Sequence, residues 1–436
     1  EIYTLSLHDA LPIFGARTGK TTCWVIPRIW AARGFVLATS NKDDIITVTR
    51  EYRSKLGRVW VFDPQAIVGE SQQWWWNILS CVTDAPTAKA LTQIFVDTTR
   101  DPRAMTNAYF DNAAKDLVAA LLLAAARGGL TIMEVYKWLA NPDDREPLTI
   151  LRQHGESTMA QTLDGAMALV AETRSGVYGS AITIVSFMTN DSAMRWVTPQ
   201  PHLPQLHPAD LVRSTDTLYC LSQEGPKSAA PIMTALTVAV TEAAVELATT
   251  QPGGRLAVPM LVELDEAANI CPWSELPSMY SHFGSRGIVV DTILQSWSQG
   301  EARWGKEGLR KLASAANQML YAGGVKEAAF LGDLEKLIGT YYLDSVQRSH
   351  STQAGSSTST SLESQQRPIA TVSDLAELPK GRAWLLSTGN PPVYTAMVPH
   401  YKQRPPVAEY AVSPMADTAA VKQPEPAQNP DLATER

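Results

Sequence analysis

The chain has 436 residues, a length that fits two domains or one large one. Hydrophobic residues make up 45% of it and charged residues 19%, a balance typical of globular proteins that bury a sizeable core. The net charge of −7 excludes a generally basic nucleic-acid surface but is compatible with a local basic channel, and no apolar run reaches the length of a membrane span.

Residues 1–13 differ in character from the rest of the chain. The run from Tyr3 to Ile13 resembles the translation of a sequencing-adapter oligonucleotide, which indicates that the natural beginning of the chain has been replaced. We therefore expect the strand that should lead into the next motif to be missing, and we exclude these residues from functional reasoning.

The first motif is a glycine-containing turn that runs into a predicted helix, Cys23 to Arg33. Small residues allow backbone N–H groups to converge on a phosphate, and the N-terminus of a helix adds its positive end. In such a motif Lys20 reaches the β- and γ-phosphates, and the Thr21 hydroxyl ligates Mg²⁺. Phe14 stands where the motif normally has its first glycine. The predicted phosphate-binding loop consists of Gly15, Ala16, Arg17, Thr18, Gly19, Lys20, Thr21 and Thr22.

Strands and helices alternate after this loop. Residues 35–39 and 59–64 are predicted to form short strands, and residues 42–56 have a helical pattern. The spacing predicts βαβ units on a parallel sheet, in which ligands bind at the carboxyl ends of the strands. The segments 39–42 and 63–64 lie at two such ends.

Three consecutive tryptophans, Trp74, Trp75 and Trp76, follow the second strand. Aromatic rings can stack on nucleic-acid bases. A cluster of this kind more often belongs to a core or a subunit interface, and we favour that interpretation.

The pattern changes between residues 86 and 208, where strand signals disappear and helical patterns recur. We expect an all-helical domain, residues 86–208, inserted between the two halves of a sheet domain. The fold class predicted from the sequence is therefore α/β, with a mostly parallel sheet and an inserted all-α domain.

A second motif lies far downstream, where a mostly apolar strand, residues 259–264, ends in Asp265 and Glu266. In enzymes with a phosphate-binding loop, one carboxylate at this place holds Mg²⁺ and its neighbour positions or activates water. The alternative is a buried strand followed by a helix N-terminus, where acidic residues interact favourably with the dipole. Because both motifs are present, we favour a nucleotide site. The next strand, residues 287–294, ends at Gln295.

Two late segments are predicted to lack fixed structure. Residues 350–366 are rich in Ser, Thr and Gln and nearly free of apolar residues, which is typical of a flexible loop. Residues 404–436 are dominated by Pro, Ala, Glu and Gln, which is typical of a disordered tail.

Several of these segments together resemble the type IV secretion coupling proteins, the TraG/TraD-like hexameric ATPases of conjugative DNA transfer, in an actinobacterial-type form. Their order and spacing hold over about residues 15–400. The resemblance implies a RecA-like P-loop NTPase domain, residues 14–85 and 209–400, that carries the all-helical domain. Relatives usually have transmembrane helices before the loop, so it also implies an N-terminally truncated fragment. The segments that carry the resemblance are residues 17–22, 26–27, 39–42, 61–64, 76–77, 264–269, 285–288, 294–296 and Gln299.

The resemblance also implies roles for single residues. The loop would cradle the phosphates of ATP, and Mg²⁺ would be held by Thr21 and, through water, by Asp265. Glu266 would orient or deprotonate the attacking water. Gln295 would sense the γ-phosphate, its alternative being a strand cap, and Arg286 would be an arginine finger for a neighbouring subunit, its alternative being an ordinary surface arginine.

The partners implied by the resemblance are DNA, a relaxase or relaxosome, the components of a type IV secretion channel, and further copies of the chain in a hexameric ring. The implied place is the cytoplasmic side of the bacterial inner membrane, reached through a segment before this chain. Two alternatives stay open at this stage. One is a nucleotide-binding scaffold that docks secretion substrates, and the other is a different RecA-like ring translocase of DNA.

Overall fold

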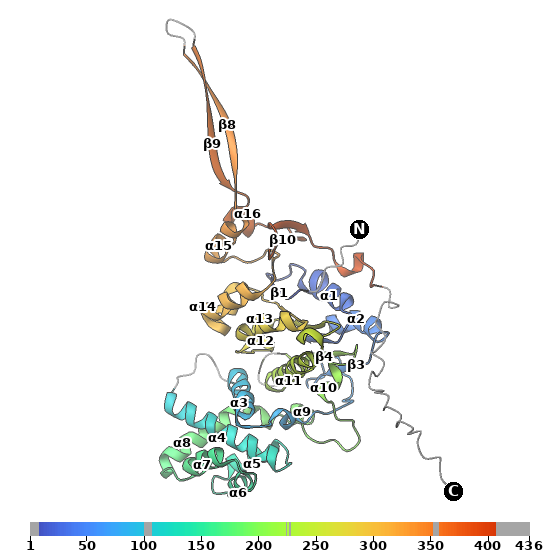
Figure 1. Ribbon diagram of the computed structural model, residues 1–436, viewed down its shortest axis with the longest axis vertical. Coiled ribbons are helices and arrows are strands. Elements are labelled where there is room, and N and C mark those ends of the chain that lie inside the picture. The colour runs from blue at the N-terminus through green and yellow to red at the C-terminus, as the bar shows by residue number, and fades with distance from the viewer. Residues whose placement is uncertain (1–7, 100–106, 224, 226–227, 352–356, 407–436) are drawn as a thin grey trace, which may run out of the picture.

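The computed structural model describes residues 8–99, 107–223, 225, 228–351 and 357–406. At its centre lies a nine-stranded sheet with the strand order β11-β10-β7-β1-β6-β5-β2-β4-β3 (Figure 1). The strands from β7 to β3 in this order are parallel, whereas at one edge β10 pairs antiparallel with β7 and β11 pairs antiparallel with β10. This arrangement confirms the predicted α/β class with a mostly parallel sheet. The strands are β1 (Ala10–Ile13), β2 (Val36–Ser40), β3 (Val59–Phe62), β4 (Thr217–Leu221), β5 (Met260–Leu264), β6 (Ile288–Thr292), β7 (Gln318–Tyr321), β10 (Arg382–Ser387) and β11 (Val393–Ala396).

The strand that leads into the phosphate-binding loop is present, so the expectation that it is missing is wrong. β1 is fully buried and pairs in parallel with β7 along its length and with β6 at Ala10. Its apolar residues suit a strand that is covered on both faces. Pro12 has no N–H to donate, but its carbonyl accepts a hydrogen bond from the Leu294 backbone N–H at 3.0 Å.

Each face of the sheet has its own hydrophobic layer. On one face, α1 (Ile26–Ala31) and α2 (Asp44–Arg53) pack against the strands. On the other face, α11 (Ala230–Thr249) and α13 (Leu276–Arg286) pack against the same strands. Among the described residues, α11 is the one helix long and apolar enough to span a membrane, and most of it is buried here as a core helix.

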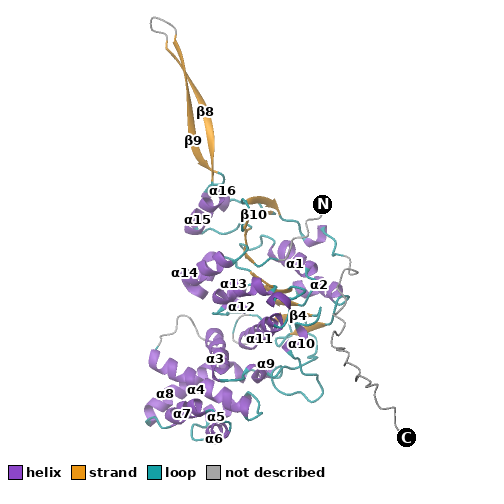
Figure 2. Cartoon of the chain, in the orientation of Figure 1, coloured by secondary structure: helices purple, strands orange, loops and turns teal. Residues whose placement is uncertain are grey.

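Helices occupy the stretch between β3 and β4, which confirms the predicted all-α insertion. Figures 1 and 2 show them as a bundle at one end of the molecule. The segment from Leu117 to Ala125 in α4 is completely buried, as its apolar sequence requires. The helices of eight or more residues in this stretch are α3 (Ala85–Thr99), α4 (Ala108–Arg127), α5 (Met133–Ala140), α6 (Glu146–Gln153), α7 (Ser157–Met167) and α8 (Ala171–Ile184).

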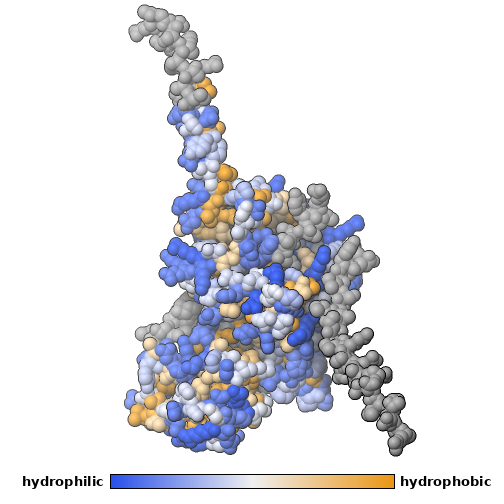
Figure 3. Space-filling view, viewed as in Figure 1, coloured by the Kyte–Doolittle hydropathy of each residue, from blue (hydrophilic) through white to orange (hydrophobic). Residues whose placement is uncertain are grey.

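A long hairpin projects from the opposite end (Figure 1). β8 (Thr340–Ser351) pairs antiparallel with β9 (Ser357–Pro368), so the prediction of a flexible loop over residues 350–366 is wrong for the described part of that range. Hydrogen bonds between the two strands hold this segment in an extended conformation, and composition alone does not predict such pairing. The space-filling view shows apolar side chains near the base of the hairpin (Figure 3), and Leu343 and Ile369 in this part of the chain are exposed. The predicted tail, residues 404–436, lies outside the described residues from residue 407 onward.

Candidate nucleotide-binding site

The loop after β1 folds back tightly against a second glycine loop. The Phe14 N–H donates to the Leu294 carbonyl, and the Gly15 N–H donates to the Gly323 carbonyl, both at 2.9 Å. A Cβ atom on Gly15 would lie 2.4 Å from the backbone of Gly324, so only glycine fits at this position. Phe14 itself is 1% exposed and packs in the hydrophobic layer on the α1 face of the sheet.

The helix after the loop begins at Thr21, two residues before the predicted start. Its first turn, η1 (Thr21–Val25), has π-helical hydrogen bonding and continues directly into α1. Gly19 has a φ of 98°, and the Thr18 hydroxyl donates to the Gly15 carbonyl at 2.7 Å, which closes the turn. The backbone therefore has the form of a phosphate-binding loop at the N-terminus of a helix.

Lys20 meets the two carboxylates at the end of β5. Its Nζ atom lies 2.8 Å from Asp265 Oδ1 and 3.0 Å from Glu266 Oε1. The structure thus brings Lys20 to Glu266, 246 positions further along the chain, and to its neighbour Asp265. Glu266 has a left-handed backbone, with a φ of 54°, which costs about 1–2 kcal/mol for a residue with a Cβ atom. Backbone strain of this kind gathers at functional sites.

Two amide side chains hold the Glu266 carboxylate from the strands on either side of β5. From the β6 side, Gln295 Nε2 donates to Glu266 Oε1 at 2.6 Å. From the β2 side, Asn41 Nδ2 donates to Glu266 Oε2 at 2.8 Å. Sequence reasoning placed Asn41 at the carboxyl end of a strand but did not name it as a site residue. The signal was available, because the carboxyl ends of neighbouring parallel strands meet at one edge of the sheet.

Burial and charge both act on the ionisable groups here. Burial lowers the pKa of the Lys20 ammonium, but the carboxylates of Asp265 and Glu266 more than offset this, so its pKa lies above the ordinary value. Burial raises the pKa of Asp265 to about 6, although the ion pair with Lys20 opposes the rise. Both pKa shifts result from the same two causes, which are burial of the charged groups and their close approach to each other.

The pocket has a volume of about 450 Å³, within the usual range for small-molecule sites. Among the described residues, no group of three or more His, Cys, Asp or Glu side chains forms a metal cage. The donor set still fits Mg²⁺, which usually takes one or two protein oxygens and completes its shell with phosphates and water. Thr21, which lines the pocket, and Asp265, which pairs with the pocket residue Lys20, are the residues that would supply such oxygens. The lining residues are Phe14, Gly15, Ala16, Arg17, Gly19, Lys20, Thr21, Thr22, Lys42, Asp44, Glu266 and Gln295.

Of the two predicted site arginines, Arg17 lines the pocket and Arg286 does not. Arg17 lies in the loop with an exposed side chain and a φ of 61°. Arg286 is the last residue of α13 and precedes β6, whereas Gln295 follows β6. Within one chain, Arg286 therefore lies at the edge of the sheet opposite the pocket.

A second cluster of charged groups is buried beside the same helix and strands. Arg28 in α1 donates from Nε and Nη2 to the two carboxylate oxygens of Asp291 in β6, each at 2.7 Å. The Trp24 indole N–H donates to the same carboxylate at 3.2 Å. Glu263 in β5 is paired with Asp291 across the two strands and is fully buried. Burial, together with the Asp291 carboxylate, raises the pKa of Glu263 well above its usual value, which favours the neutral carboxyl group.

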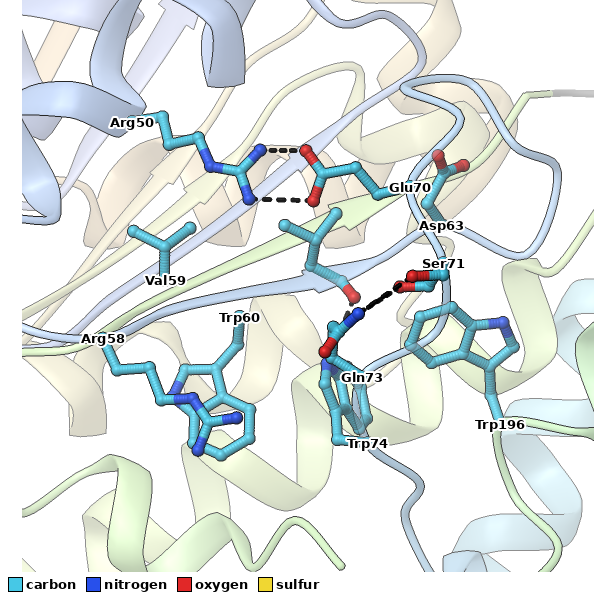
Figure 4. Close-up of a pocket in the computed structure, with 11 residues that line it drawn as sticks. Arg50, Arg58, Val59, Trp60, Asp63, Glu70, Ser71, Gln73, Trp74 and Trp196 are labelled. Carbon is cyan, nitrogen blue, oxygen red and sulfur yellow. Dashed lines mark hydrogen bonds and ion pairs between the residues drawn. The ribbon is translucent and has the colours of Figure 1, made fainter. Parts of the chain in front are cut away.

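A smaller pocket of about 220 Å³ lies along β3 at the edge of the sheet (Figure 4). The Arg58 guanidinium stacks 3.7 Å from the centre of the Trp60 ring, and Arg50 pairs with Glu70. Trp74 and Trp76 are each 1% exposed, so these two tryptophans belong to the core. Trp74 forms part of the buried wall of this pocket, and its indole N–H donates to the Val61 carbonyl at 3.1 Å.

Comparison with known proteins gives a consistent result. Residues 259–380 match the family described as the TraM recognition site of TraD and TraG. The bacterial conjugative coupling protein TrwBdeltaN70, in its unbound form, has 15% identity and a TM-score of 0.64 over 91% of this chain and 85% of its own. TrwB with the non-hydrolysable ATP analogue ADPNP has 13% identity and a TM-score of 0.64 over 89% and 85%. TrwB with ADP and Mg²⁺ has 14% identity and a TM-score of 0.62 over 89% and 84%.

No curated protein matches the chain by sequence. At these low identities the structural matches establish the fold, and they confirm the predicted RecA-like P-loop core with an inserted helical domain. The residues that match the family model belong to the carboxyl-terminal part of that core and include Asp265, Glu266 and Gln295. The chain thus has the fold of a conjugative coupling protein, and residues 259–380 match a TraD and TraG family, which confirms its resemblance to the TraG/TraD-like coupling proteins.

Proposed function

We propose that the chain is the ATP-hydrolysing part of a coupling protein, which recruits relaxase-bound DNA and pumps it to a type IV secretion channel during conjugation. The observation that carries this proposal is the convergence of Lys20, Asp265 and Glu266 beside a phosphate-binding loop. ATP and Mg²⁺ are the proposed ligands of the pocket. The complexes of TrwB with ADPNP and with ADP and Mg²⁺ support this choice.

The proposed chemistry divides among the pocket residues. The backbone of residues 15–22 and the Lys20 ammonium bind the phosphates, and the Thr21 hydroxyl and Asp265 hold Mg²⁺, which neutralises phosphate charge when bound. Glu266 accepts a proton from the attacking water, and Gln295 orients toward the γ-phosphate. If Arg286 acts on a nucleotide, it acts in a neighbouring subunit, because it lies at the edge of the sheet opposite the pocket of its own chain.

The proposal extends to partners and location. We place the chain in a hexameric ring at the cytoplasmic side of the bacterial inner membrane, attached through a preceding segment. Its partners are DNA, the relaxosome and components of the secretion channel. The matched TraM recognition family supports a relaxosome partner for residues 259–380.

The first test measures ATP binding and turnover, with and without single-stranded DNA. Lys20→Ala should abolish ATP binding, because the phosphates lose their main cation. Glu266→Gln should retain binding but lower kcat by at least about 100-fold, the smallest contribution usual for a general base. Lys55→Ala, which removes an exposed lysine just after α2, is the matched control and should leave both quantities unchanged.

The outcomes separate the candidate functions. DNA-stimulated turnover that disappears in both site variants supports the motor. ATP binding without turnover, with relaxase binding that survives Lys20→Ala, would instead support a docking scaffold. Unchanged nucleotide affinity in Lys20→Ala would overturn the nucleotide site itself.

A further inference from the structure

The two oxygens of the Glu266 carboxylate have different surroundings. Oε1 accepts hydrogen bonds from Lys20 and Gln295, and both of these residues line the pocket. Oε2 accepts its hydrogen bond from Asn41, which is not among the residues that line the pocket. One oxygen therefore faces the place where a nucleotide would bind, and the other is held from behind.

The residue that holds Oε2 is itself anchored. Asn41 follows Ser40, the last residue of β2, which is 2% exposed. The Ser40 carbonyl accepts from the Ser222 N–H at 3.0 Å, and its hydroxyl accepts from the Lys42 N–H at 3.2 Å. The backbone on both sides of Asn41 is thus tied to the sheet and to its own turn.

Lys20 and Gln295, the two partners of Oε1, could contact phosphate groups instead of Glu266 when a nucleotide is bound. Lys20 forms ion pairs with Asp265 and Glu266 in this structure, and an ammonium group prefers the higher charge of a triphosphate. Gln295 lies at the pocket wall with an amide that can turn toward the same phosphates. If both turn away from Glu266, Oε1 is free to accept a proton while Oε2 stays bonded to Asn41.

From this asymmetry we propose that Asn41 is a positioning residue for ATP hydrolysis. It fixes Oε2 so that Oε1 is the oxygen presented to the attacking water. This inference rests on the proposed function, because it acts through Glu266 as the general base. A carboxylate with only one fixed oxygen still has a defined direction, whereas one released on both sides can rotate about its last bond and lose its alignment.

The test is a double-mutant cycle on ATP turnover in the complete chain. Asn41→Ala should lower kcat by about 10- to 100-fold, the loss typical of a misaligned catalytic group, with the KM for ATP unchanged. In a Glu266→Gln background the same substitution should cause no further loss, because a residue that acts through Glu266 has nothing left to position. Single-turnover measurements with labelled ATP make the low residual rates measurable.

Two further variants separate positioning from simple damage to the turn. Asn41→Asp keeps the shape of the side chain but replaces the donor with a like charge, so kcat should fall at least as far as in Asn41→Ala. It also decides the question if Asn41→Ala does not fold. Asp43→Ala alters an exposed residue of the same turn, which makes no side-chain capping bond to α2, and should leave kcat unchanged.

Several results would overturn the inference. These are an unchanged or increased kcat in Asn41→Ala, a parallel loss of ATP affinity, or equal fold-losses in the two backgrounds. Its failure is distinct from failure of the proposed function. If Glu266→Gln blocks turnover and Asn41→Ala does not, only the role of Asn41 is wrong. If Glu266→Gln itself turns over at the parent rate, the proposed general base is wrong.

Discussion

The loop-helix segment meets the sheet through two charged clusters of similar composition. At the edge of the sheet, Lys20 pairs with Asp265 and Glu266 beside an open pocket. Inside the protein, Arg28 pairs with Asp291, and Glu263 lies next to them without access to solvent. Each cluster consists of one cation and two carboxyl groups.

The two clusters differ in whether the cation can exchange its carboxylate partners for another anion. Lys20 is a flexible point charge that can leave its carboxylates for a phosphate, since the pocket admits one. Arg28 is held by two parallel hydrogen bonds in a site where nothing can replace Asp291. Access from the pocket, rather than charge composition, therefore separates a binding site from an internal ion pair.

The largest expected effect that tests this comparison is on stability. Arg28→Ala leaves the Asp291 carboxylate buried without its partner and should lower the free energy of unfolding by about 3–5 kcal/mol. Lys20→Ala should cost less than Arg28→Ala, because Glu266 lines the pocket and keeps its hydrogen bonds to Gln295 and Asn41 when Lys20 is removed. Urea unfolding of both variants measures the difference. Equal losses would show that the pocket cluster is as structural as the internal one.

The next effect concerns pH. Burial raises the pKa of Asp265 to about 6 from an ordinary value of 3.8, so the folded protein binds a proton more tightly here than the unfolded chain. The contribution of this group to stability is full below about pH 4 and is lost as pH rises through about 6. We expect Asp265→Asn to remove a decline of at most about 1.4 kcal/mol per pH unit in that interval. Unfolding curves from pH 4 to pH 6 check this. An identical slope in the variant and its parent would contradict the assignment.

The smallest effect is expected at Glu263. Because its raised pKa favours the neutral carboxyl group, Glu263→Gln substitutes one neutral group for another of the same shape. The free energy of unfolding should change by less than about 1 kcal/mol, and ATP turnover should stay at the parent level. The same change at Glu266 should nearly abolish turnover. A large loss of stability in Glu263→Gln would mean that the buried group carries a charge.

Local motifs predicted the part of the site that lies along single strands. One motif is a glycine-containing turn before a helix, and the other is a pair of acidic residues after an apolar strand. Each motif predicts residues that lie at the carboxyl end of a strand. Parallel strands then bring Lys20, Asp265 and Gln295 to one edge. The roles of these residues in catalysis stay predictions.

What sequence reasoning missed depends on contacts between distant residues. The bond from Asn41 to Glu266 joins residues 225 positions apart, and that from Arg28 to Asp291 joins residues 263 positions apart. No local pattern encodes either. The hairpin β8–β9 was missed because its Ser- and Thr-rich composition resembles that of flexible segments, whereas its order comes from pairing across the turn. β1 was missed because its residues were judged by their apparent origin rather than by their apolar pattern.

One continuous hydrophobic cluster runs from the sheet through α11 into α3 and α4 of the helical insertion. Close-packed interiors yield little and transmit strain. Among the described residues, apolar packing therefore joins the helical insertion directly to the sheet, so strain at the carboxyl ends of the strands can pass through α11 into the bundle.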